Sequence, residues 1–313
     1  MVLMHRLRIR ALALLLVLGS AAGVAQTPAP RLRSEQATPP PAGSVFWCPM
    51  HPDVRGREGD KCPLCGMMLV RAAATDYSAY VLDFETDPHV LRPRQKARAR
   101  FYVRDPRSLA TVRRFDPVHE RVFHLFVISQ DLEYFAHVHP TLHRDGSLDV
   151  DIELPRPGMY QLIADFLPAG GSPQLIQKSF VTAGYTGPLV AVPNLARDIA
   201  DKVVGDTRVS VTMPEPIAGR EQLVTFELHD AATGAPVTDL EPYLGAAGHL
   251  LLVSSDLDIA FHSHPVAEIS AQRGPTVVFQ ILFPREGDYR MWVQFQRHGE
   301  VLTSPFTIPV KGS

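Results

Sequence analysis

The sequence has few cysteines and no surplus of basic charge. Only 3 of its 313 residues are cysteine, which excludes a scaffold held together by many disulfides. Its 31 Lys and Arg residues are balanced by 33 Asp and Glu, so the charge gives no reason to expect nucleic-acid binding. With 45% hydrophobic residues the chain is not mostly disordered, and its length suits two modest domains with appendages.

The sequence also lacks the short motifs of several enzyme classes. It contains no G-x-S-x-G nucleophile elbow, no Walker loop and no dinucleotide-binding fingerprint. All three thiols lie in one short segment, so the β-rich remainder of the chain lacks the cysteine that a type 1 copper centre needs. We therefore expect a protein that is not an enzyme and that does not transfer electrons like a blue-copper protein.

The first 25 residues have the features of a Sec-type signal peptide. Three arginines precede an apolar run at 11–18, which is short for a membrane span of about 20 residues. Gly23 and Ala25 fit the −3 and −1 positions of a cleavage site. We expect cleavage and therefore an exported protein, periplasmic or secreted, with no transmembrane segment after signal removal. An uncleaved membrane anchor is the alternative.

Composition divides the rest of the chain. A Pro-rich stretch is followed by a compact cysteine-rich unit and then by short β-rich runs, separated by turn residues, in which apolar and polar side chains alternate. Such runs are typical of antiparallel β-sandwiches, and the only helical pattern is short, at 195–204. The expected division is a signal peptide at 1–25, a flexible Pro-rich linker at 26–44, a Cys/His metal knuckle at 45–72, β-sandwich repeat 1 at 76–183, a linker at 184–204 and β-sandwich repeat 2 at 205–313.

The two β-rich halves repeat one another. Residues 101–105 align with 226–230, and the same offset of 125 carries the H-x-H-P motif at 137–140 onto 262–265. Beyond that motif the offset becomes 129, and Tyr160 then matches Tyr289. The predicted fold class is therefore mainly β: a small metal knuckle followed by two tandem antiparallel sandwiches of the Ig-like or cupredoxin-like kind.

All three cysteines belong to two closely spaced knuckles. Cys48 and His51 form C-x2-H, and Cys62 and Cys65 form C-x2-C. Two such knuckles can bring three thiolates and one imidazole to a tetrahedral centre. A unit this small has too little core to fold by itself, so metal binding would supply most of its folding free energy.

The knuckle segment resembles a known family. The run CPMHP, followed by KCPLCGMML, is similar to the small heavy-metal-binding domain attached to copper-exporting P-type ATPases and to periplasmic adaptors of copper/silver efflux systems. The resemblance implies heavy-metal ions as ligands and an envelope metal-efflux component as a partner. Met68 departs from it, because the family usually has an acidic or polar residue there. The expected metal ligands are Cys48, His51, Cys62 and Cys65, with Met50, Met67 and Met68 as further soft donors. The two repeats are similar to sandwich domains of an exported bacterial family in which they follow this module.

Three interpretations of the knuckle stay open. Zn(II) would make it a structural staple. Cu(I) or Ag(I) would instead be captured by thiolates together with methionine sulfur, because soft ligands select soft ions. A disulfide between two of the cysteines in an oxidising compartment is the third interpretation.

Each repeat also places three histidines on a predicted β-hairpin. If the first turn is centred on 131–132, antiparallel pairing sets His124 opposite His139 and Phe126 opposite His137. Alternate residues share a face, so the three imidazoles gather on one side. Three neutral imidazoles suit Cu(II) or Zn(II).

The second repeat has the same pattern. The possible second metal sites are His124, His137 and His139 in repeat 1 and His249, His262 and His264 in repeat 2. The alternative is that these histidines are structural and bond to loop carbonyls. His119 and His143 have no match in repeat 2, and we expect them to be accessory at most. Gly245 and Gly248 indicate a close backbone approach just before His249.

Taken together, these features predict an exported heavy-metal-binding protein. Its cargo would be copper, as Cu(I) or Cu(II), or else zinc or silver, which it would capture, buffer or deliver in the periplasm. The alternative function is a zinc-stapled structural protein that docks on an envelope or efflux complex. A metal-dependent enzyme would require solvent access to an open three-histidine site.

Overall fold

The computed structural model describes the two repeats and parts of the knuckle. The described residues are 46–47, 55–57, 59–61, 69–71, 79–190, 193, 195–266 and 273–312. The expected signal peptide and Pro-rich linker, and the ligands Cys48, Met50, His51, Cys62, Cys65, Met67 and Met68, lie outside them. All the named elements are strands, and no described helix is long and apolar enough to cross a membrane.

The knuckle segment contributes one small antiparallel sheet. Its strand order is β2-β1-β3, formed by Arg55–Gly56, Phe46–Trp47 and Val70–Arg71. Phe46 and Leu69 are buried, so some core exists beside the strands.

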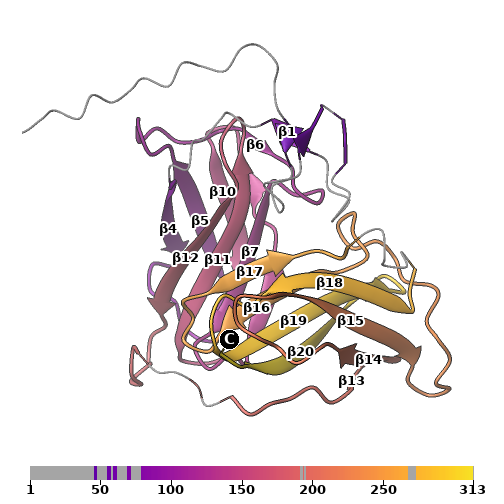
Figure 1. The fold of residues 1–313 in the computed structure, drawn as a ribbon. Helices are drawn as coiled ribbons and strands as arrows, with labels where there is room; N and C mark the ends of the chain where they lie inside the picture. Colours follow the sequence, from indigo (N-terminus) through magenta and orange to yellow (C-terminus); the bar gives the residue numbers. More distant parts are fainter. Residues whose placement is uncertain are drawn as a thin grey trace, which may run out of the picture. The chain divides into compact units, whose positions relative to one another are not determined.

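Repeat 1 is a two-layered sandwich, drawn in purple to pink in Figure 1. One sheet has the order β4-β5-β10-β9, with bounds Val81–Asp87, Ala97–Arg104, Ser147–Ile152 and Thr141–Leu142. The other has the order β12-β11-β7-β8, with bounds Gln174–Val181, Met159–Pro168, Phe123–Ser129 and Phe135–Val138, and β6 (Phe115–Asp116) pairs with β11. Strand β5 alternates buried and more exposed residues, as a strand with one face on a core should.

Repeat 2 repeats this architecture in orange to yellow (Figure 1). Its first sheet has the order β13-β14-β15-β18, with bounds Lys202–Val204, Thr207–Thr212, Glu221–Asp230 and Thr276–Leu282. Its second has the order β17-β16-β19-β20, with bounds Ala260–Ser263, His249–Ser254, Gly287–Arg297 and Glu300–Val310. The predicted mainly β class with two tandem sandwiches is confirmed.

Strand β7 is buried at every one of its 7 residues, and β16 at all 6 of its own. Phe123 and Leu125 face the core of repeat 1, whereas Phe126 and Ile128 belong to a separate core. That core is shared with repeat 2, which contributes Trp292 among others. The two sandwiches therefore contact one another through the sheets that contain β7 and β16.

The contact between the sandwiches is reciprocal. The Gln161 side-chain amide donates to the Leu257 carbonyl at 3.2 Å, and the Arg290 guanidinium donates to the Leu132 carbonyl at 3.1 Å. Gln161 and Arg290 are equivalent in the two repeats, as are Leu132 and Leu257. Equivalent residues that exchange contacts are the mark of a two-fold interface. The repeats thus pack on one another as the two copies of a symmetric dimer do.

The helix expected at 195–204 is wrong. Residues 202–204 form the edge strand β13, and Asp198 exchanges backbone hydrogen bonds of 3.1 and 2.8 Å with Thr307. Leu195 is buried in the core between the sandwiches. These longer-range pairings satisfy the backbone groups that a helix would otherwise have bonded internally.

Candidate metal centre

Seven histidines gather where the two sandwiches meet. Their rings form one chain of contacts that runs through both repeats, with centroids from 3.5 to 6.0 Å apart. Four of them are almost wholly buried, with 1 to 4% of their surface exposed. The members are His119, His124, His137 and His139 of repeat 1 and His249, His262 and His264 of repeat 2.

The predicted hairpin register is confirmed in both repeats. Phe126 pairs with His137 between β7 and β8, and Leu251 pairs with His262 between β16 and β17. This register brings His124 and His139 together at the end of the first hairpin. The turn and the period of two thus place the imidazoles of each hairpin on one face.

The three histidines of repeat 1 form a compact triangle of nitrogen atoms. His124 Nδ1 lies 3.0 Å from His137 Nε2, and His139 Nε2 lies 3.3 and 3.2 Å from those two atoms. Metal–imidazole bonds of about 2.0–2.1 Å in a tetrahedral site separate two ligand nitrogens by about 3.3–3.4 Å. The triangle therefore has nearly the size of one face of a coordination tetrahedron.

The hydrogen bonds on the outer nitrogens decide which nitrogens of this triangle carry lone pairs. His124 Nε2 lies 2.9 Å from the Val118 carbonyl and must donate to it, which leaves Nδ1 without a proton. The side-chain N–H of Gln294 donates to the Thr303 hydroxyl. The side-chain oxygen of Gln294 therefore accepts from His137 Nδ1 at 2.8 Å. His124 Nδ1 and His137 Nε2 therefore face each other with lone pairs at 3.0 Å, an arrangement that a bound cation would stabilise.

Repeat 2 has the same arrangement. His249 Nε2 donates to the Tyr243 carbonyl at 2.9 Å, and His262 Nδ1 donates to the Asp165 carboxylate at 2.6 Å. The inner atoms, His249 Nδ1 and His262 Nε2, lie 3.2 Å apart, and His249 Nδ1 carries a lone pair because the other nitrogen of that ring donates to the carbonyl. Asp165 belongs to repeat 1 and bonds to a histidine of repeat 2, whereas Gln294 of repeat 2 bonds to His137 of repeat 1.

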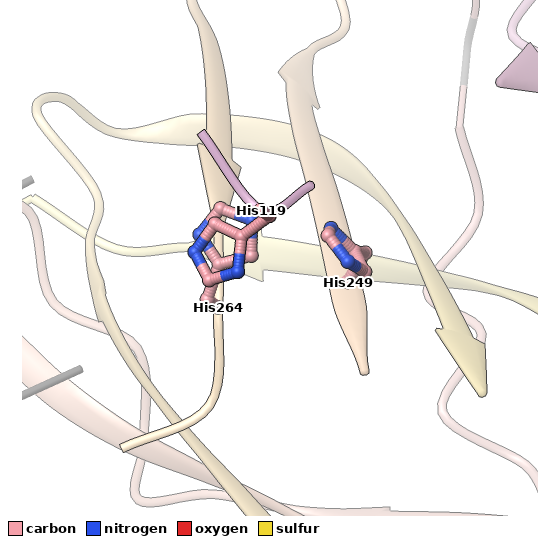
Figure 2. A group of neighbouring side chains, drawn as sticks. All are labelled: His119, His249 and His264. Atoms are coloured by element: carbon pink, nitrogen blue, oxygen red, sulfur yellow. The ribbon is translucent and has the colours of Figure 1, made fainter. Parts of the chain in front are cut away.

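A further group joins His119 of repeat 1 to His249 and His264 of repeat 2. One nitrogen from each ring lies within 4.8 Å of the other two. The His119 ring stacks on His264 with centroids 3.5 Å apart, and Figure 2 shows His249 to one side of this pair. A corresponding group is formed by His124, His137 and His262.

Two different family models match the knuckle and the repeats. A model described as "Domain of unknown function (DUF8832)" matches residues 75–182 and 202–312, which is more than half of the chain. The chain belongs to the DUF8832 family. A second model, described as "Heavy metal binding domain", matches residues 45–72 of this DUF8832 chain, so the protein has a metal-binding module ahead of its two repeats.

Solved structures resemble the DUF8832 chain only distantly. The Escherichia coli adhesin FdeC is 13% identical, with a TM-score of 0.24, over 75% of this chain and 66% of the adhesin. The fibronectin(III)-like modules of Clostridium thermocellum CbhA are 10% identical, with a TM-score of 0.21, over 74% of this chain and 95% of theirs. Yersinia pseudotuberculosis InvD is 14% identical, with a TM-score of 0.22, over 74% of this chain and 58% of its own. No curated protein matches, and scores this low carry no argument about function.

Burial keeps six imidazoles of the cluster neutral. Loss of solvation, reinforced by neighbouring imidazoles, lowers the pKa of His119 and His139 to about 3 and that of His124 to about 4. The same causes hold the pKa values of His137, His249 and His264 well below the usual range. Neutral imidazoles offer lone pairs at neutral pH, which is the protonation state that metal binding requires.

Asp165 supplies negative charge beside these neutral rings. Burial acts to raise its pKa, but the hydrogen bond from His262 outweighs burial and lowers the pKa. The carboxylate is therefore ionised at neutral pH and favours a cation in the cluster.

The two histidines expected to be accessory have different surroundings in the DUF8832 fold. His143 pairs with the Asp149 carboxylate and is half-exposed, so it plays no part in the cluster. His119 belongs to the cluster, which the repeat pattern did not reveal because the equivalent residue is Leu244. The available signal was its place in the loop that leads into β7, beside Val118, whose carbonyl accepts from His124.

Proposed function

We propose that this chain is an exported heavy-metal-binding protein that captures, buffers or delivers copper in the periplasm, with zinc or silver as alternative cargo. One observation carries the proposal for the repeats: His124 Nδ1 and His137 Nε2 face each other with lone pairs at 3.0 Å. Two lone pairs at this distance repel. A cation bound between them relieves the repulsion, as does a proton on His139 Nε2, which lies 3.3 and 3.2 Å from the two atoms. The heavy-metal-binding module at 45–72 supports metal as the ligand of the whole chain.

The two parts of the chain suit different ions. The knuckle would bind Cu(I), Ag(I) or Zn(II) through thiolates and one imidazole, because thiolates and thioethers favour soft ions. The proposed ligands there are Cys48, His51, Cys62 and Cys65, with Met50, Met67 and Met68 as further donors. The imidazole cluster would bind Cu(II) or Zn(II), which are borderline ions.

Burial favours binding over catalysis. A catalytic metal needs a coordination position open to substrate or water. His124 has only 1% of its surface exposed, and its outer nitrogen is occupied by a loop carbonyl. We propose no catalytic step for this site.

The test is a competitive metal titration of the purified chain. His137→Ala should lower the number of Cu(II) or Zn(II) ions bound, and Cys62→Ser should weaken Cu(I) binding. The matched control is His143→Ala, which alters a half-exposed histidine paired with Asp149 and should change neither. A single zinc that copper cannot displace, unaffected by His137→Ala, would instead favour the structural, zinc-stapled function.

A further inference from the structure

We infer that the two sandwiches hold two metal ions side by side, the second bound by His119, His249 and His264 and therefore completed across the repeats. This inference rests on the proposed metal-binding function and goes beyond it in number, location and ligand set. The sequence pattern assigned one three-histidine set to each repeat, whereas the structure groups His119 of repeat 1 with His249 and His264 of repeat 2.

Unpartnered nitrogens are the first argument. Both ring nitrogens of His264 and Nε2 of His119 are buried and have no hydrogen-bond partner among the described residues. Burying a polar atom without a partner costs free energy, so native structures rarely retain one without a reason. A metal ion would engage one lone pair from each ring.

The geometry of the group is the second argument. The Nε2–H group of His249 donates to the Tyr243 carbonyl, so Nδ1 is the nitrogen of His249 that is left to bind a metal. That ring meets His264 edge-on with centroids 4.6 Å apart, while His119 lies flat over His264 (Figure 2). One nitrogen of each ring lies within 4.8 Å of the other two. Because an imidazole binds a metal through a lone pair in its ring plane, one of the two stacked rings must rotate as the three nitrogens close on the ion.

The number of imidazoles calls for two ions. A tetrahedral ion takes four ligands at most, whereas seven imidazoles lie together here. The triangle of His124, His137 and His139 accounts for one ion, and the group containing His119 accounts for another. His262 is grouped with His124 and His137, and its Nε2 lies 3.2 Å from His249 Nδ1. A ligand within reach of both groups places the two ions next to one another.

The loop carrying His119 makes the pair of sites asymmetric. His119 has a φ of 47°, and Leu244, its equivalent in repeat 2, has a φ of 51°. The two loops therefore have similar backbones, but only the loop of repeat 1 presents an imidazole. His119→Leu consequently introduces a residue that this loop already accommodates in the other repeat, and the variant is expected to fold.

The experiment counts metal in the full chain. After equilibrium dialysis against Zn(II), elemental analysis should give one ion fewer per chain for His119→Leu than for the parent protein. The control His143→Leu should match the parent. His119→Asn serves as a second variant, because asparagine tolerates a positive φ and is a poor ligand for zinc. Circular dichroism verifies the fold of each variant.

A spectroscopic readout tests adjacency. The three cysteines are replaced by serine so that thiols do not reduce Cu(II), and the chain is loaded with Cu(II). Two neighbouring Cu(II) ions should couple and lose electron paramagnetic resonance intensity. The His119→Leu variant should show the full signal of one isolated ion.

The outcomes separate this inference from the proposed function. If folded His119→Leu and His119→Asn both retain the parent metal count, or if two uncoupled Cu(II) signals are found, the second adjacent site is overturned. If the repeats bind one ion that only His137→Ala removes, the proposed function stands and this inference falls. If they bind none, both the second site and the metal function of the repeats are wrong.

Discussion

At the scale of single residues, the partner of each outer nitrogen determines what each imidazole can do. Val118 and Tyr243 hold equivalent histidines through backbone carbonyls, so those two histidines are oriented alike. The other partners differ: Gln294 offers a neutral amide to His137, whereas Asp165 offers a carboxylate to His262. A carboxylate partner strengthens an imidazole as a metal ligand more than an amide does, so we expect His262 to bind metal more strongly than His137.

Asp165→Asn tests this difference. Asparagine retains an oxygen that can accept from His262 Nδ1 but removes the buried negative charge. We expect metal affinity of the cluster to fall by about 10–100-fold, the usual cost of losing such a supporting partner. Competition titration with a chelator of known affinity measures the change. Gln294→Glu is the matched variant and should strengthen binding; equal affinity in all three proteins would show that the carboxylate does not tune the site.

The buried neutral histidines should make the metal-free protein sensitive to acid. Their pKa values of about 3 to 4 in the folded chain lie below the unfolded value of about 6.5. Below pH 6.5 the unfolded chain therefore binds protons that the folded chain does not, so stability falls as pH falls towards 4 and is insensitive to these groups above pH 6.5. Each such histidine contributes roughly 1 kcal/mol per pH unit. Urea unfolding of chelator-treated protein between pH 7.5 and 5 should show this loss, and a flat profile would contradict it.

At the scale of elements, the sequence predicts the hairpins well because two short-range rules act together. The turn at 131–132 and the alternation of side chains fix which residues oppose each other, and the observed pairing of Phe126 with His137 follows. The continuous apolar runs in β7 and β16 also indicate burial on both faces. The sequence does not reveal what covers the second face, because that contact joins strands more than a hundred residues apart.

Gly248 holds the start of β16 close to β19, as the glycines before His249 indicated. A Cβ at this position would lie 2.9 Å from the Gln294 carbonyl oxygen and 2.9 Å from the Phe295 ring. Gly248→Ala should therefore destabilise the fold by about 1–3 kcal/mol and weaken metal binding, because His249 follows directly. Urea unfolding and zinc titration measure the two effects. The control is Gly299→Ala, in which the new Cβ meets nothing within 4 Å. The φ of 77° strains an alanine there and lowers stability, but metal binding should stay unchanged. Equal effects of the two variants on metal affinity would argue against a positioning role for Gly248.

At the scale of the whole chain, the histidine cluster is a product of the interface between the repeats. Asp165 bonds to a histidine of repeat 2, Gln294 bonds to a histidine of repeat 1, and Leu132 and Leu257 accept reciprocal hydrogen bonds. Internal repetition in the sequence predicts two similar sandwiches, but it carries no information on which faces meet. His119 could not be assigned for the same reason, since its partners belong to the other sandwich.

Metal should therefore stabilise the two sandwiches as one unit. Trp292 lies in the shared core, stacked on Phe135 with centroids 5.0 Å apart, and its fluorescence reports the interface once Trp47→Phe has removed the other tryptophan. Zinc at one hundred times its dissociation constant should raise the free energy of unfolding by about 2.7 kcal/mol for each site. For a chain of this size that is an increase of roughly 5–10 °C in the midpoint of the Trp292 transition. A chelator should reverse the increase, and the double variant His119→Leu with His139→Ala should lose it. If zinc shifts the midpoint of the double variant as much as that of the parent, the stabilising ion is bound elsewhere, and the cluster does not join the sandwiches through metal.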